Sequence, residues 1–117
     1  MAPSLKEKQF AAYIVDLMQS LGSVNAKAMF GGFGIFLNGT MFGLVFDNVL
    51  YLKADKETKK EFKELGLEPF TYIKKGKELK MSYFQAPEDA VEDHEIMKIW
   101  GLKAYNSALR AVKKTKK

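Results

Sequence analysis

Apolar residues recur at helical spacing near the start of the chain, which predicts an amphipathic helix. Its apolar face consists of Phe10, Ile14, Leu17, Met18 and Leu21. Ser4-Leu5-Lys6-Glu7 has the pattern of a capping box, in which the serine hydroxyl accepts from an amide and the glutamate reaches back to the serine amide. We therefore expect a core helix that begins after Ser4 and is stopped by Gly22.

Strand-type runs follow at residues 26–30, 33–37, 40–46 and 49–54. Asn38-Gly39 lies between two of these runs and predicts a hairpin, because a type I′ turn needs positive φ at both central residues. Asp47-Asn48 predicts a second tight turn. The first two runs fit either two strands or one strand bent at Gly31-Gly32. Residues 42–52 are nearly all apolar outside the turn, so these strands are expected at the centre of an antiparallel sheet.

The next segment predicts a short helix and a second hairpin. Asp55 can cap a helix over residues 56–65, and Glu68-Pro69 then favours extended chain. Residues 70–73 and 78–84 form the predicted strands around a loop at 74–77. In the second strand Leu79, Met81 and Tyr83 alternate with polar residues, which predicts one buried face and one solvated face.

A long helix closes the chain, capped by Asp93 and predicted to end near Val112. It carries two apolar stripes. One stripe comprises Met97, Trp100, Ala104, Ala108 and Ala111, and the other comprises Ile99, Leu102, Tyr105, Leu109 and Val112. Either the helix is wedged between the sheet and the first helix, or the second stripe is a surface for a partner or for a second copy of the chain.

Composition favours one soluble domain. The 117 residues are 47% hydrophobic and include no cysteine, so the chain can bury a core without disulfides, and thiolate metal sites are excluded. We expect one domain over residues 1–112 and a flexible, Lys-rich tail over residues 113–117. No apolar run approaches the roughly 18 residues of a membrane span, and no targeting signal precedes the first helix. A cytoplasmic location is therefore expected.

The net charge of +5 is concentrated at the end of the chain. Six of the 19 basic residues lie at or after Lys103, whereas no acidic residue follows Glu95, so residues 1–102 carry 13 basic and 14 acidic side chains. A weak nucleic-acid interface is the alternative function, because lysines are interleaved with Tyr72 and Tyr83 in the second hairpin. Its candidate contacts are Lys74, Lys75, Lys77, Lys80, Lys113 and Lys114.

Searches for catalytic, cofactor and metal motifs give no candidate residue. Gly31-Gly32-Phe33-Gly34 lacks the third glycine of a dinucleotide loop and has no Walker lysine. These glycines instead predict a bulge or a close backbone approach. His94 is the chain's single histidine and is expected at the surface. We therefore expect a domain that is not an enzyme and that needs no cofactor or metal.

The order of several short motifs resembles one known family. The motifs are Met29-Phe30-Gly31-Gly32-Phe33-Gly34-Ile35, Met41-Phe42-Gly43-Leu44, Leu50-Tyr51-Leu52-Lys53-Ala54-Asp55, Pro69-Phe70-Thr71-Tyr72, Met81-Ser82-Tyr83, Ala86-Pro87 and Trp100. Together they resemble the TfoX (Sxy) N-terminal domain over nearly the whole chain.

The resemblance implies an α+β fold of two layers, α-β(3)-α-β(2)-α, with an antiparallel sheet as in the secretion-chaperone class. It also implies a link to the regulation of natural competence genes. The expected function is a non-enzymatic regulatory or protein-interaction module with a protein partner, such as transcription machinery, and with a homodimer as one outcome. The family supplies no catalytic motif.

Overall fold

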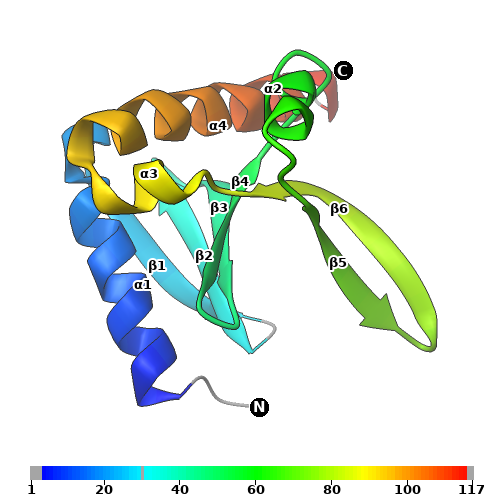
Figure 1. The fold of residues 1–117 in the computed structure, drawn as a ribbon, viewed down its shortest axis with the longest axis horizontal. Helices are drawn as coiled ribbons and strands as arrows, with labels where there is room; N and C mark the ends of the chain where they lie inside the picture. The colour runs from blue at the N-terminus through cyan, green and yellow to red at the C-terminus, as the bar shows by residue number, and fades with distance from the viewer. Residues whose placement is uncertain (1–3, 30, 116–117) are drawn as a thin grey trace.

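The computed structural model describes residues 4–29 and 31–115, which form one antiparallel sheet with helices packed on one face (Figure 1). The helical elements are α1 (Leu5–Leu17), η1 (Gln19–Leu21), α2 (Lys59–Glu64), α3 (Glu88–Glu92) and α4 (His94–Thr115). The strands are β1 (Val24–Met29), β2 (Gly32–Leu37), β3 (Thr40–Phe46), β4 (Val49–Lys53), β5 (Pro69–Lys74) and β6 (Lys77–Gln85). The predicted α+β class is confirmed.

The six strands have the order β1-β2-β3-β4-β6-β5, with every neighbouring pair antiparallel. The interpretation of the first two runs as one bent strand is wrong, since β1 and β2 are separate antiparallel strands paired side by side, with Met29 opposite Gly32. Four strands, not three, therefore precede α2. Gly31, with φ of 79°, lies where the chain reverses. A Cβ on Gly32 would lie 2.2 Å from the carbonyl oxygen of Val45, so only glycine permits this approach to β3.

The predicted tight turns are confirmed by their backbone angles. Asn38 and Gly39 have φ of 51° and 78°, and Asp47 and Asn48 have φ of 52° and 61°. Positive φ at both central positions is the signature of the type I′ turn, whose twist matches that of the flanking strands.

A β-bulge in β3 explains how Phe42 and Val45, which are three positions apart, both reach the same face of the sheet. The register jumps so that Ile35 pairs with Gly43 while Phe36 pairs with Met41, which leaves Phe42 as the extra residue. Phe42 and Val45 are both fully buried in the cluster beneath the helices. An extra residue shifts the alternation of side chains by one, so both can point to the same side.

The helices cover this face of the sheet. The Ser4 capping box is present, with the Glu7 amide 3.2 Å from the Ser4 hydroxyl and the Ser4 amide 2.9 Å from the Glu7 carboxylate. The predicted apolar face of α1 lies in the core or packs against it. The chain tightens into η1 before Gly22, whose φ of 137° ends the helical segment.

Of the two caps predicted for the later helices, Asp93 is confirmed and Asp55 is not. Asp55 accepts from the amides of Glu57 and Thr58, but residues 56–58 form a turn and α2 begins only at Lys59. Asp93 accepts from the amides of Glu95 and Ile96, as predicted. Helix α4 continues past the predicted end at Val112, as far as Thr115.

The β5–β6 hairpin projects away from the rest of the molecule (Figure 1). Its base forms a second cluster on the other face of the sheet, where Phe70 contacts the rings of Phe46 and Tyr51 at centroid distances of 5.4 and 5.0 Å. The predicted buried face of β6 is only partly correct, because Tyr83 is 9% exposed but Met81 is 41% exposed. Residues 83–85 of β6 pair with β4, whereas Met81 lies beyond them in the two-stranded part of the hairpin.

Candidate interaction surfaces

The inner face of α4 packs into the main core. Met97, Ala104 and Ala108 are at most 3% exposed, and the Trp100 ring lies 5.1 Å from that of Phe62. At Gly101 the helix comes so close to η1 that a Cβ would lie 2.7 Å from a methyl of Leu21. The first predicted stripe is therefore a core stripe.

The second predicted stripe lies on the outer face of α4 and stays largely in solvent. Ile99 is 56% exposed, and Leu102, Leu109 and Val112 are 40%, 37% and 38% exposed. We call these four side chains the outer stripe. The interpretation of α4 as a wedge buried on both sides is wrong, because the sheet and η1 pack against its inner face while the outer stripe stays exposed.

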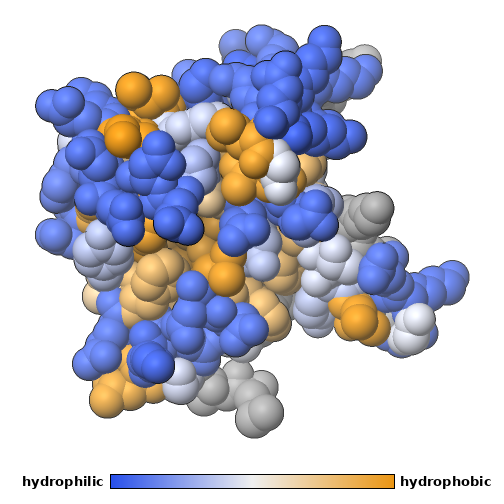
Figure 2. Space-filling model, in the orientation of Figure 1, coloured by the Kyte–Doolittle hydropathy of each residue, from blue (hydrophilic) through white to orange (hydrophobic). Residues whose placement is uncertain are grey.

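Tyr105 differs from the rest of its predicted stripe. It is half-buried, with its ring edge-on to Phe42 at 5.6 Å, and its hydroxyl accepts from the amide of Asn38 at 3.4 Å. Its ring therefore supports the core, and only its edge borders the outer stripe. Apolar side chains interrupt the hydrophilic surface over α4 in the space-filling view (Figure 2).

Charge changes sign along α3 and α4. The acidic residues gather at the start of this segment and are Glu88, Asp89, Glu92, Asp93 and Glu95. Every charged residue after them is basic. This arrangement agrees with the helix dipole, and it gives the helical edge an acidic end and a basic end.

The predicted nucleic-acid contacts do not form one patch. Lys75 and Lys77 are exposed at the tip of the β5–β6 hairpin, whereas Lys113 is exposed near the end of α4, and Figure 1 shows these two regions far apart. The side chains of Lys74, Lys80 and Lys114 lie outside what the structure describes. The predicted contacts that the structure describes therefore lie in two separate regions and not in one continuous groove.

A polar network that the sequence analysis missed joins α4 to the turn before α2. Arg110 donates to Asp55 at 2.5 Å and to the Ser107 hydroxyl at 3.3 Å, and Ser107 lies 3.1 Å from the Thr58 hydroxyl. The pKa of Asp55 is lowered to about 2, mainly by the hydrogen bond that Arg110 donates to its carboxylate. Asp55 and Arg110 are distant in sequence, so only their cap and helix patterns were visible, not the pairing.

The described residues contain no group of His, Asp or Glu side chains that could hold a metal ion. His94 is exposed at the start of α4, as predicted. Burial raises the pKa of Tyr83 to about 12, because a phenolate would be poorly solvated within this aromatic cluster. Within residues 4–29 and 31–115, no helix combines the length and the apolar character that crossing a membrane requires.

Comparison with known proteins identifies the family. The family model of the TfoX N-terminal domain matches residues 16–108. The DNA transformation protein TfoX1 of Aliivibrio fischeri is 38% identical over 73 residues, which cover 62% of this chain and 35% of that protein. The DNA transformation protein TfoX of Haemophilus influenzae is 29% identical over 89 residues, which cover 75% of this chain and 41% of that protein. The chain thus matches less than half of each relative's length, and it belongs to the TfoX N-terminal domain family.

Proposed function

We propose that this domain is a non-enzymatic regulatory module that acts through protein contacts, and that its contact surface is the outer stripe of α4. The exposure of four large apolar side chains along one helix face carries this proposal. The relatives are named DNA transformation proteins, which supports a role in regulating DNA uptake for this chain as well.

The outer stripe differs from the other exposed apolar residues. Leu5, Leu65 and Ile73 are more exposed, but they lie on α1, after α2 and on β5 respectively, and single surface apolar residues are normal. The outer stripe instead runs along α4, at spacings that keep its members on one face. Covering each such side chain contributes roughly 1 to 2 kcal/mol of favourable free energy.

We propose a second copy of the chain as the occupant, with the two α4 helices antiparallel. A two-fold axis near residues 105 and 106 would place Ile99 against Val112 and Leu102 against Leu109 of the other copy. This orientation also brings the acidic start of each helical edge toward the basic end of the other, whereas a parallel pairing would bring like charges together. Lys98 and Lys113 flank the stripe, and their long side chains can reach solvent past it.

The experiment is light scattering after size exclusion at tens of micromolar. We expect the wild-type protein at twice the 13.3 kDa of the chain. The double variant Leu102→Glu with Leu109→Glu is expected to be a folded monomer, because burying unpaired charge costs more than the lost contacts return. These sites are already exposed, so the fold should survive the substitutions.

Leu5→Glu with Leu65→Glu is the matched control, since it makes the same change at two exposed sites away from α4. The control should remain dimeric. A wild-type mass equal to that of one chain, or a dimer that survives both glutamates in α4, would refute the proposed occupant.

A further inference from the structure

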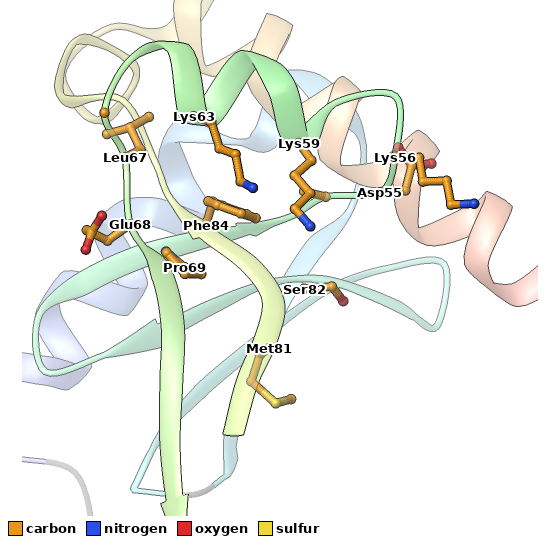
Figure 3. A pocket seen from close by; sticks show the side chains of 12 residues that line it. Asp55, Lys56, Lys59, Lys63, Leu67, Glu68, Pro69, Met81, Ser82 and Phe84 are labelled. Atoms are coloured by element: carbon orange, nitrogen blue, oxygen red, sulfur yellow. The ribbon is translucent and has the colours of Figure 1, made fainter. Parts of the chain in front are cut away.

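A pocket of about 620 Å³ lies between α2 and the base of the β5–β6 hairpin (Figure 3), and no residue of the outer stripe lines it. We call it the lysine pocket, because three lysines line it, one in the turn before α2 and two on α2. They are Lys56, Lys59 and Lys63. The spacing of four residues keeps Lys59 and Lys63 on one side of α2.

The lysine pocket has an excess of positive charge. Figure 3 shows the ammonium groups of Lys59 and Lys63 extending from α2 toward β6. Among the described residues, the ion pairs involve Lys103 and Arg110, so none of the three pocket lysines is neutralised in that way. Asp55 in the wall is already engaged by Arg110, and Figure 3 shows the Glu68 carboxylate at the opposite end of the pocket from Lys59.

A hydroxyl in the pocket is prepared to donate a hydrogen bond. The Ser82 oxygen accepts from the Lys53 ammonium at 2.5 Å, and Lys53 also lies over the Tyr83 ring at 5.3 Å. Since one lone pair of Ser82 is occupied by a cation, its own O–H remains available for an anion in the pocket. Two ammonium groups and a hydroxyl are the donors that a phosphate oxygen accepts from.

The rest of the wall is apolar. Leu67, Pro69, Met81 and Phe84 line the side formed by β5, β6 and the loop that precedes them. Met81 is 41% exposed, so its thioether is accessible from the pocket. Flexible methionine side chains adapt readily to flat apolar groups.

We propose that the lysine pocket binds a phosphate-bearing small molecule with a flat apolar part, of the chemical class of the nucleoside phosphates. The phosphates lie against Lys59, Lys63 and Ser82, and the ring lies against Pro69 and Met81. The volume is within the range of small-molecule sites, roughly 300 to 1,000 Å³. The inference is independent of α4, so the loss of one proposal leaves the other standing.

Isothermal titration with ATP, in the absence of divalent metal and at constant ionic strength, tests this site. The variant Lys59→Gln with Lys63→Gln is expected to bind ATP at least about tenfold more weakly than wild type, because each charged hydrogen bond is worth about a factor of ten. Lys8→Gln with Lys60→Gln is the control, since it removes the same charge at two exposed lysines outside the lysine pocket. This control should bind as wild type does.

Adenosine and pyrophosphate test which part of ATP is recognised, and duplex DNA tests whether the pocket binds nucleic acid instead. Adenosine and pyrophosphate are each expected to bind more weakly than ATP, because adenosine lacks the phosphates and pyrophosphate lacks the ring. Equal affinity for pyrophosphate and ATP would overturn the apolar part of the proposal and leave an unselective anion site. Equal weakening in both double variants, or no heat with millimolar ATP, would overturn the site itself. Short duplex DNA that binds wild type and is displaced by ATP would replace the small molecule with nucleic acid.

Discussion

Single backbone positions determine where this chain reverses, and Gly39 is the clearest case. Its φ is 78°, and a Cβ built on it would have no heavy atom within 4 Å. Replacing Gly39 with valine therefore adds backbone strain without a steric clash. We expect Gly39→Val to lower the free energy of unfolding by about 1 kcal/mol or more, since β-branched residues resist positive φ. Urea denaturation measures this loss.

Gly39→Asn is the matched control, because asparagine adopts the left-handed region far more readily than valine. Its unfolding midpoint should stay close to that of wild type. A valine variant with an unchanged midpoint would show that the turn does not depend on the backbone conformation at Gly39.

The Asp55–Arg110 ion pair makes stability depend on pH. The pKa of Asp55 is lowered from 3.8 to about 2, so the folded state favours its ionised form. The resulting stabilisation is present above pH 3.8 and is lost as the pH falls toward 2. After allowance for partial exposure it amounts to about 1 kcal/mol. We expect Asp55→Asn to reduce stability at pH 5 and to change it little at pH 2.5.

Urea denaturation of both proteins at the two pH values gives the comparison. Asparagine can still accept from the amides of Glu57 and Thr58, so the turn before α2 is preserved and the ion pair alone is tested. An equal stability difference between the two proteins at pH 5 and pH 2.5 would show that Arg110 does not hold the Asp55 carboxylate in its ionised form.

At the scale of secondary-structure elements, the sequence predicts features that depend on neighbouring residues, but it does not predict the contacts between elements. The caps at Ser4 and Asp93 and the turn at Asn38-Gly39 depend on neighbouring residues, and these predictions are confirmed. Asp55 instead closes the turn before α2 and does not cap that helix. The sequence does not show whether Gly31-Gly32 bends one strand or joins two strands in a turn, because glycine is favoured in both. Only the approach of β3, with the Val45 carbonyl beside Gly32, distinguishes them.

Helix α4 is another case in which the local pattern was predicted but the contacts between elements were not. Its two apolar stripes followed from spacing alone, but which stripe is buried depends on where α1 and the sheet lie. The bulge at Phe42 and the lysine pocket were also invisible in the sequence. Each needs a register or a packing angle between segments that no local pattern encodes.

At the scale of the whole molecule, the charge distribution argues against strong nucleic-acid binding. Residues 1–102 carry 13 basic and 14 acidic side chains, so the net charge of +5 arises from the end of the chain. The exposed lysines of the hairpin and of α4 are also far apart (Figure 1). Each of these two groups could therefore contact only a few phosphates, and affinity for DNA depends on the number of phosphates neutralised.

We predict that any retardation of duplex DNA in a gel is weak, appears only at low salt and depends on residues 113–117. Removing these residues takes away four lysines and leaves Val112 and the outer stripe in place. The truncated protein should not retard DNA at any salt concentration. Lys75→Gln with Lys77→Gln removes charge at the hairpin instead and should weaken retardation less. Tight, salt-resistant binding by the truncated protein would contradict the argument from charge, because it would require a base-reading or stacking surface on residues 1–112.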